Sequence, residues 1–272
     1  MQRIGIEFIT VFGQPPVEFV HLAADVGCRD IGLALAPMFE SPLGYPSWSL
    51  RDDHALRRGV RAALKERDVS IALGEGFLIR PGTEIGDSGG DLDLMCELGA
   101  LRINMCSIDP DLSRSYDQCA RLAEMAEARG LESTLEFGPV FTIADLKSAL
   151  AARQHVGRKT FRLLVDTLHL ARAGLGASDI AALPAGTIGY AQLCDAPRAF
   201  TQESYMNEAR FERMVPGEGE LPLAEIVAAL PADIVIGLEI PMLREAKAGV
   251  GARERVGRCV EATRSLLARL GR

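Results

Sequence analysis

The sequence predicts an α/β protein that folds as a single (β/α)8 TIM barrel. Eight short, β-rich segments alternate with longer segments of helical periodicity, which is the pattern of repeated βα units. A chain of 272 residues is a normal length for one such barrel. An open doubly wound sheet is the alternative, but it rarely needs eight regular units, and no GxGxxG motif follows the first strand. No linker or low-complexity tract divides the chain, so we expect residues 1–272 to form one domain.

The elements can be assigned in order along the chain. The expected strands are 4–10, 30–35, 70–76, 101–106, 133–137, 161–167, 187–195 and 233–240. The expected helices are 16–27, 52–68, 89–99, 115–130, 142–154, a shorter one near 170–182, 223–231 and 252–270. Two connections that follow strands, 36–51 and 196–222, are long, and long ordered loops often form lids or binding walls.

Composition excludes several classes of partner. The net charge is −7 and no block of basic residues is present, so we expect neither nucleic acid nor an anionic membrane as a partner. No apolar run approaches the roughly 18 residues that span a bilayer, and the N-terminal segment lacks the pattern of a signal peptide. Six dispersed cysteines without CxxC spacing are typical of free thiols in a reducing compartment. We therefore expect a soluble, cytoplasmic protein.

Four polar residues lie at or near the ends of four successive strands, inside apolar runs: Glu136, Asp166, Gln192 and Glu239. The chemistry of a barrel sits at this end of its strands. Three carboxylates that converge on one point repel each other unless a cation lies between them. Carboxylate and amide oxygens suit a hard divalent ion such as Mg²⁺ or Mn²⁺. The sequence therefore predicts a metalloenzyme.

Four motifs in order resemble the xylose-isomerase-like barrels, also called the sugar phosphate isomerase/epimerase or AP endonuclease family 2 superfamily. They are DTLH (166–169), QLCDAPR (192–198), VPGEGE (215–220) and LEIP (238–241). The resemblance covers nearly the whole chain. It implies one divalent metal ion held by Glu136, Asp166, Gln192 and Glu239, with Mn²⁺ or Mg²⁺ expected and Co²⁺ or Zn²⁺ as alternatives. Such barrels are often dimers or tetramers, so a homo-oligomer is left open.

The pattern departs from parts of this family. In the ketose 3-epimerases the third ligand is usually histidine, whereas Gln192 resembles the hydroxypyruvate isomerases and 3-dehydroshikimate dehydratases. Thr142 stands where the epimerases often have a second glutamate. The dehydratases usually carry Ala-Trp-Gly soon after the first metal glutamate, where this chain has Phe-Gly-Pro at 137–139. Arg80 is the nearest counterpart of their arginine after the third strand.

The resemblance also implies roles for individual residues. Glu136 and Glu239 inherit the roles of proton acceptor and donor, and His169 would bind substrate or act as an acid or base. In a dehydratase His169 would be the principal base. Arg198 stands where the epimerases place an arginine beside the substrate. From their own positions in the sequence, Arg213 and Glu218 are further candidates for binding substrate, and Glu75, with Glu7 and Asn104, lies on an early strand where it would line the pocket.

The leading hypothesis is a metal-dependent isomerase or epimerase that abstracts a proton next to the carbonyl of a small sugar, keto-polyol or hydroxy-keto acid. The alternative is a lyase that removes water from a substrate of the 3-dehydroshikimate or keto-inositol type. An inert barrel subunit would lack a ligand, and all four positions are filled. A DNA-repair endonuclease would need several metals, many histidines and a basic groove, whereas this acidic chain has four histidines.

Overall fold

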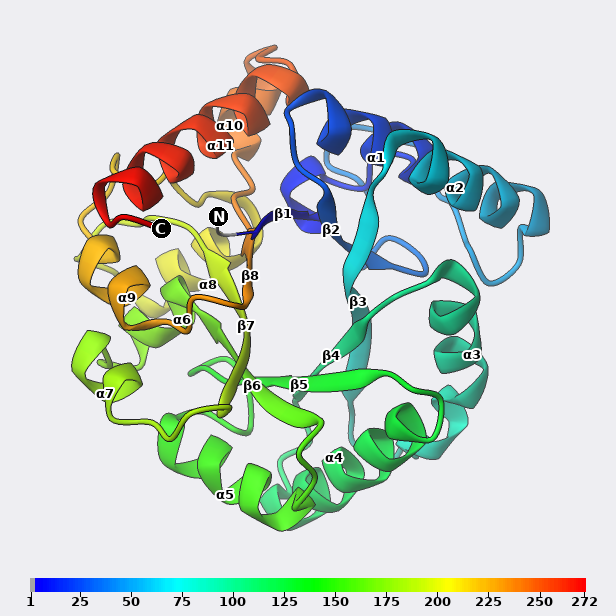
Figure 1. The fold of residues 1–272 in the computed structure, drawn as a ribbon, viewed down its shortest axis with the longest axis vertical. Coiled ribbons are helices and arrows are strands. Elements are labelled where there is room, and N and C mark those ends of the chain that lie inside the picture. The colour runs from blue at the N-terminus through cyan, green and yellow to red at the C-terminus, as the bar shows by residue number, and fades with distance from the viewer. Residues whose placement is uncertain (1–2) are drawn as a thin grey trace.

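The computed structural model describes residues 3–272 and confirms the (β/α)8 barrel (Figure 1). Eight parallel strands follow one another in chain order around the ring, and the eighth pairs with the first. The strands are β1 Arg3–Glu7, β2 Asp30–Ala34, β3 Ser70–Ile79, β4 Arg102–Ser107, β5 Glu132–Glu136, β6 Phe161–Asp166, β7 Ile188–Leu193 and β8 Val235–Leu238.

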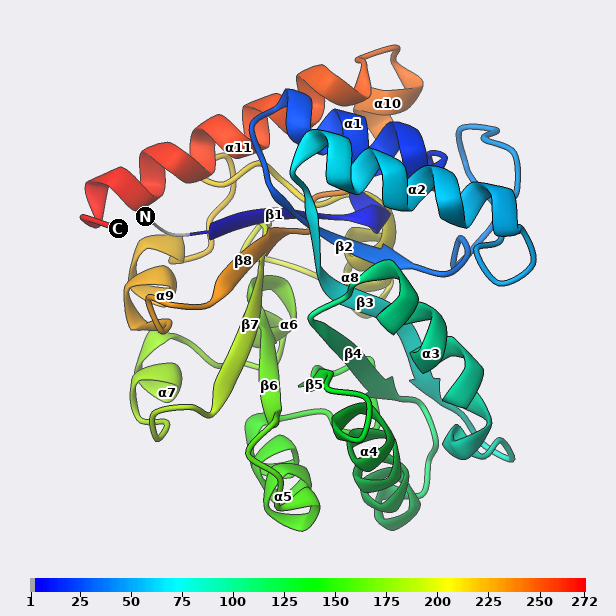
Figure 2. The same ribbon diagram turned by 45° about the vertical axis from the view of Figure 1, so that its right-hand side comes forward.

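Helices surround the barrel on the outside, as Figures 1 and 2 show. The α-helices are α1 Pro16–Asp25, α2 His54–Arg67, α3 Gly89–Leu98, α4 Leu112–Glu127, α5 Leu146–Val156, α6 Thr167–Arg172, α7 Ala177–Ala181, α8 Gln202–Phe211, α9 Leu223–Ala229, α10 Leu243–Lys247 and α11 Ala252–Arg269. Two 3₁₀ helices are η1 Phe8–Val11 and η2 Ile85–Ser88. Helices α1 and α11, from opposite ends of the chain, lie side by side and complete the ring.

The structure differs from the expected elements in several places. The first strand ends at Glu7 and turns into η1, while β3 continues to Ile79. The short helix expected near 170–182 is two helices, α6 and α7, with Gly174 and Gly176 between them. The loop 196–222 contains α8, whose N-cap Thr201 forms a capping box with Ser204.

Local signals explain several helix starts. Asp53 caps α2 by accepting from the backbone N–H of Leu56, and Asp111 caps α4 in the same way. Asp145 opens α5, which is why this helix begins four residues after the expected position at 142. None of the helices in the described part of the chain is both long enough and apolar enough to span a membrane.

The barrel interior is layered, because alternate residues of each strand point inward. Arg102 and Arg162 both bond Glu132 at the amino ends of the strands. A small buried cluster fills the middle, and it consists of Ala72, Leu73, Leu164, Tyr190 and Val235. The carboxyl ends of β5 to β7 then present the polar residues of the candidate site. The main hydrophobic core lies between the sheet and the surrounding helices.

Candidate active site

Polar side chains converge where β5 to β8 end. Glu136 and Asp166 are the last residues of β5 and β6, and Glu239 follows β8 directly. Gln192 is paired in register with Asp166 on the neighbouring strand. Glu136, Asp166 and Gln192 are buried, and Glu239 is mostly buried, with 12% of its side chain exposed. The strand ends thus bring together the four residues predicted from the sequence.

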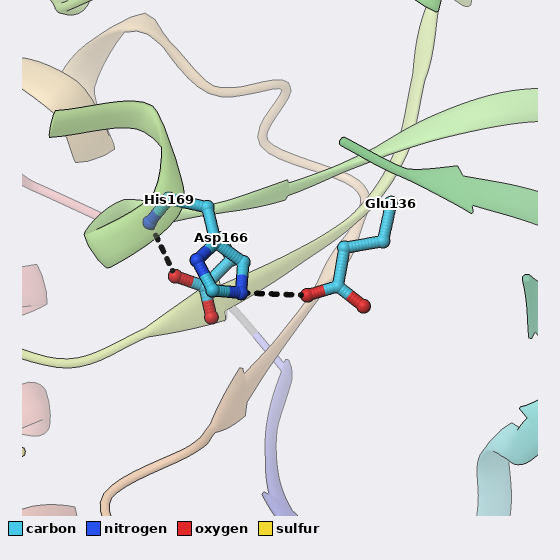
Figure 3. Close-up of side chains that lie close together, drawn as sticks. All are labelled: Glu136, Asp166 and His169. Atoms are coloured by element: carbon cyan, nitrogen blue, oxygen red, sulfur yellow. Dashed lines mark hydrogen bonds and ion pairs between the residues drawn. The ribbon is translucent and has the colours of Figure 1, made fainter. Parts of the chain in front are cut away.

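Asp166 organises the helix that carries His169. One oxygen of Asp166, Oδ1, accepts from the backbone N–H groups of Leu168 (2.7 Å) and His169 (3.0 Å), so the carboxylate caps α6. The imidazole Nε2 of His169 lies 3.3 Å from Glu136 Oε1. Ligand-type atoms of Glu136, Asp166 and His169 all lie within 4.8 Å of one another (Figure 3). His169 therefore joins two of the predicted metal ligands.

Gly138 leaves room for the imidazole. A Cβ at this position would lie 2.8 Å from the Cβ of His169, closer than such atoms approach. The Phe-Gly-Pro run that departs from the family pattern thus has a packing reason at its glycine: the chain after β5 passes against the start of α6.

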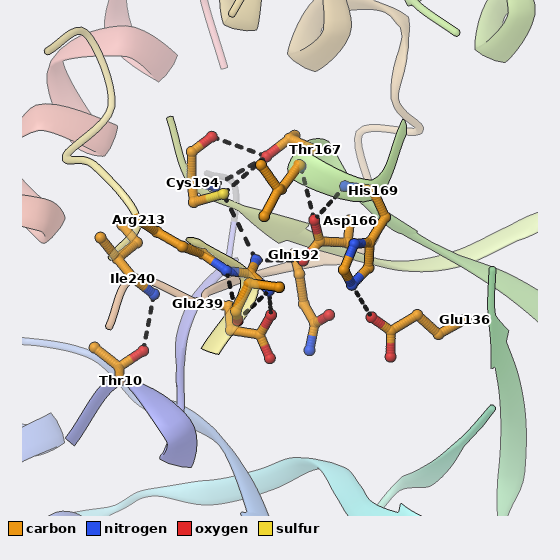
Figure 4. Close-up of polar contacts among 12 residues, drawn as sticks. Thr10, Glu136, Asp166, Thr167, His169, Gln192, Cys194, Arg213, Glu239 and Ile240 are labelled. Atoms are coloured by element: carbon orange, nitrogen blue, oxygen red, sulfur yellow. Dashed lines mark hydrogen bonds and ion pairs between the residues drawn. The ribbon is translucent and has the colours of Figure 1, made fainter. Parts of the chain in front are cut away.

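Arg213 lies between two of the predicted ligands, as Figure 4 shows. Its Nη1 donates to Asp166 Oδ2 at 2.5 Å, and its Nη2 is 2.5 Å from Glu239 Oε2. The guanidinium is almost completely buried. The residues on either side of it are held by isolated bridges, Glu212 with Met242 and Met214 with Asp195, which fix where Arg213 leaves the chain.

A second group of hydrogen bonds holds the other side of the site. Asn104 Nδ2 donates to Glu136 Oε2 at 2.9 Å and lies 3.4 Å from Glu75 Oε2. Gln192 Nε2 donates to Glu75 Oε1 at 3.2 Å. Thr134 supports Asn104 by donating to its side-chain oxygen. Glu75, expected to line the pocket, is therefore in contact with the predicted ligand Gln192.

Glu7 lies beneath this group, inside the barrel. Its Oε1 accepts from the Tyr190 hydroxyl at 2.7 Å, and its carboxyl fits between Gly32 and Gly237, where a Cβ on either glycine would overlap it. Burial raises the pKa of Glu7 to about 8, with Glu136 and Asp166 adding repulsion. The carboxyl is therefore mostly protonated at neutral pH.

The carboxylates of the site carry more negative charge than the one guanidinium of Arg213 can neutralise. Burial raises the pKa of Glu239 well above its usual range against the pull of Arg213, and the charges of Asp166 and Glu136 raise it further. Burial also raises the pKa of Glu75. Burial acts in the same direction on Asp166, but the guanidinium of Arg213 and the backbone N–H of His169 hold the pKa of this group below its usual range.

These residues fit a divalent cation. The carboxylates of Glu136 and Asp166 offer closely spaced oxygen atoms, with the imidazole of His169 beside them. Gln192 Oε1 is buried and has no hydrogen-bond partner within the described residues 3–272, so an amide oxygen is left to bind an electrophile. A bound cation would also offset the repulsion that raises the pKa of Glu239.

A cavity of about 660 Å³ lies over these groups. Glu75, Glu136, His169, Arg213 and Glu239 contribute its polar surface. Its walls are largely apolar and include Phe39, Phe77, Phe141, Val140 and Met206, with the exposed Arg80 and Arg210 among its lining residues. Its volume and its few convergent polar groups are those of a small-molecule site.

Two predicted substrate-binding residues lie elsewhere. Arg198 and Glu218 are exposed and are not among the residues that line the cavity. The PGEGE turn instead wraps around the buried Asp195, which accepts from the backbone N–H groups of Gly217 and Leu221. The turn thus has a structural explanation that needs no contact of Glu218 with the site.

Sequence reasoning missed Tyr205, whose hydroxyl lies 2.8 Å from His169 Nδ1. Tyr205 belongs to α8, and Glu208 on the same helix forms a buried ion pair with Arg172 of α6 at 2.7 Å. The spacing of Tyr205 and Glu208, three residues apart, was the available signal, because such a pair shares one face of a helix. Glu7 and Tyr190 were also missed as a buried pair.

Comparisons with known proteins agree with the fold. The family model described as xylose isomerase-like TIM barrel matches residues 3–257. No curated protein matches the chain significantly in sequence. A solved structure of the IolI protein with a bound zinc atom is similar, with a TM-score of 0.81, 16% identity and 99% of each chain covered.

Two further structures have the same fold. D-psicose 3-epimerase from Clostridium cellulolyticum H10, solved with D-tagatose, has a TM-score of 0.72 and 16% identity, with 98% of this chain and 99% of that one covered. A xylose isomerase-like TIM barrel/4-hydroxyphenylpyruvate dioxygenase fusion protein has a TM-score of 0.77 and 21% identity, with 98% of this chain and 42% of that one covered. The closed barrel and the family match over most of the length together confirm the resemblance: the chain belongs to the xylose isomerase-like TIM barrel family.

Proposed function

We propose that this protein is a divalent-metal-dependent isomerase or epimerase that moves a proton next to the carbonyl of a small sugar, keto-polyol or hydroxy-keto acid. The observation that carries the proposal is the position of Glu136 and Glu239. Both line the same cavity, and they come from strand ends on either side of Asp166 and Gln192. Two carboxylates at one small-molecule site suit a reaction in which one group removes a proton and another returns it.

Each of the residues around the cavity has its own role in this reaction. A bound divalent ion would supply Lewis-acid polarisation of the substrate carbonyl. Glu136 is held in place by Asn104 and faces His169, so its orientation is fixed before substrate enters. Glu239 is held by Arg213. The apolar walls limit water around these groups, and Arg80 and Arg210 offer cationic groups at the cavity to an anionic part of the substrate.

The similar structures support this proposal at the level of reaction class. One of them is named as a sugar 3-epimerase and another holds a zinc atom. The oxygen-rich donor set of this chain favours Mn²⁺ or Mg²⁺, with Co²⁺ or Zn²⁺ as alternatives.

The lyase remains the second candidate, because His169 lies at the cavity beside Glu136. Loss of water from a hydroxyl next to the reacting carbon needs a proton donor. An imidazole N–H at this place would meet that need, so the two reactions share their first step and differ in whether a hydroxyl leaves.

Proton exchange in D₂O tests the proposal. The Mn²⁺-loaded protein would be incubated with hydroxypyruvate, short ketoses and 3-dehydroshikimate, and the substrates and products recovered after metal removal for proton NMR. We expect deuterium next to the carbonyl of at least one substrate, and no exchange with the Glu239→Gln variant. An aromatic product from 3-dehydroshikimate would establish the lyase. Absence of both exchange and elimination with all of these substrates would contradict the proposed function.

A further inference from the structure

The two ring nitrogens of His169 face different partners. Nδ1 lies 2.8 Å from the Tyr205 hydroxyl, and Nε2 lies 3.3 Å from Glu136 Oε1. The imidazole is buried, and the rings of Phe141 and Tyr205 contact it edge-on, with centroids 5.5 and 5.8 Å away. The ring therefore has one orientation, and the position of its proton decides what it can do at the site.

The Tyr205 side chain fixes the direction of the first hydrogen bond. Tyr205 is fully buried, and His169 Nδ1 is the hydrogen-bond partner of its hydroxyl in the described residues. A buried hydroxyl proton needs an acceptor, and a neutral imidazole nitrogen without a proton is one. Burial also raises the pKa of Tyr205, with Asp166 next in effect, so the phenol keeps its proton. Tyr205 thus donates to Nδ1.

Donation to Nδ1 determines the other nitrogen. A neutral imidazole carries one proton, so when Nδ1 is the acceptor Nε2 carries the N–H. This N–H points toward the carboxylate of Glu136, which accepts it (Figure 3). In this tautomer the nitrogen at the cavity is a donor and has no lone pair with which to remove a substrate proton.

We propose that Tyr205 is a positioning residue that holds neutral His169 in its Nε2–H tautomer, which makes His169 a hydrogen-bond donor at the cavity and leaves the role of base to a carboxylate. The meaning of this tautomer for catalysis rests on the proposed function, but the tautomer itself does not. For a lyase, the same arrangement makes His169 a hydrogen-bond donor to the departing hydroxyl and excludes it as the principal base.

The position of Tyr205 is itself held by buried contacts. Glu208, one turn further along α8, forms the ion pair with Arg172 of α6, and Arg172 also donates to the carbonyl of Pro197 at 2.9 Å. Helix α8 is therefore fixed to the helix that carries His169. The segment 196–222 supplies both the donor to His169 and, through Arg213, the cation beside Asp166.

Nitrogen NMR tests the proposal directly. Protein labelled with ¹⁵N-histidine and loaded with Mg²⁺ would be studied through two-bond ¹H–¹⁵N correlations, at a pH where the spectra themselves show a neutral ring for His169. Only four histidines are present, and the His169 signals are those lost in His169→Gln. We expect a pyrrole-type shift at Nε2 and a pyridine-type shift at Nδ1. A pyrrole-type Nδ1 in the wild type would overturn the proposal.

Matched variants test the part played by Tyr205. Tyr205→Phe should remove the preference for the Nε2–H tautomer, so that the ¹⁵N chemical shifts of the two His169 nitrogens move toward the average of the pyrrole-type and pyridine-type values. Tyr116→Phe is the control, because its hydroxyl bonds the Ser148 carbonyl away from the site, and it should leave the tautomer unchanged. An unchanged His169 tautomer in Tyr205→Phe would refute the positioning role. Since these spectra need no substrate, they are independent of the deuterium-exchange assay, whose failure would count against the proposed function alone.

Discussion

The guanidinium of Arg213 donates to Asp166 at 2.5 Å, and both side chains are almost wholly buried. The same guanidinium reaches Glu239, so one fixed cation links two of the carboxylates predicted to hold a metal. The sequence suggested Arg213 as a substrate ligand from the loop 196–222. In the structure it also partly neutralises the acidic cluster, which lets these carboxylates lie close together before any metal binds.

Replacement of Arg213 tests this counter-ion role. Arg213→Met should destabilise the metal-free protein by about 3–5 kcal/mol, because buried Asp166 and Glu239 lose their cation. Added Mn²⁺ should restore part of the loss. Urea unfolding in EDTA and in Mn²⁺ measures both effects, and the exposed Arg198→Met should change stability by less than about 0.5 kcal/mol. Equal stability of the two variants in EDTA would argue against the role.

The buried Glu7 predicts how stability depends on pH. Its pKa is about 8 in the folded protein and near 4.5 when unfolded, so the folded state binds the proton more tightly between these values. The contribution of this carboxyl to stability is therefore full below about pH 4.5 and is lost as pH rises toward 8. Since each pKa unit corresponds to about 1.4 kcal/mol, the loss is on the order of a few kcal/mol.

Glu7→Gln should flatten this dependence, because the amide stays neutral and keeps an acceptor for the Tyr190 hydroxyl. Urea unfolding of metal-free protein at several values between pH 5 and 8 measures the slope. The control is Glu18→Gln, which removes an exposed carboxylate from α1. If Glu7→Gln kept the wild-type slope of stability against pH, the Glu7 carboxyl would not be the cause of the pH dependence.

Gly138 predicts a steric effect on the site. Gly138→Ala would place a methyl group 2.8 Å from the Cβ of His169, so α6 or the imidazole must shift. We expect the free energy of unfolding to fall by about 1–3 kcal/mol, measured by urea unfolding. We also expect slower exchange of deuterium into the substrate, measured by NMR. Gly86→Ala is the matched control, because its added methyl group meets no atom within 4 Å. If both substitutions had the same effect, the close approach to His169 would be irrelevant.

The alternation of β-rich and helical segments was sufficient to predict the barrel, because each βα unit has its own local pattern. The ends of β5, β6 and β7 could also be placed, since their polar residues interrupt apolar runs. Glu75 was predicted for the pocket because it lies in a GEG turn on an early strand, and it lines the cavity.

The partners of the segment 196–222 could not be predicted from the sequence. This segment has the composition of a polar loop, and although the spacing of Tyr205 and Glu208 indicates a shared helix face, nothing local reveals that Tyr205 meets His169 or that Arg213 meets Asp166. Their partners lie on α6 and β6, about 35 to 50 residues earlier in the chain, so the pairing depends on tertiary structure. Glu7 could be placed on an early strand, but its pairing with Tyr190 and its neutral state depend on burial among Gly32, Gly237 and Tyr190, which only the folded barrel provides.

Calorimetric titration of the metal-free protein with Mn²⁺ tests the central claim most directly. We predict one ion bound per chain. Glu136→Gln and Asp166→Asn should each weaken binding by more than the roughly 10- to 100-fold that loss of an outer-shell partner costs, whereas the exposed Glu218→Gln should bind as the wild type does. Absence of binding to the wild type, or equal affinity in all three variants, would contradict a metal centre at the ends of β5 to β8.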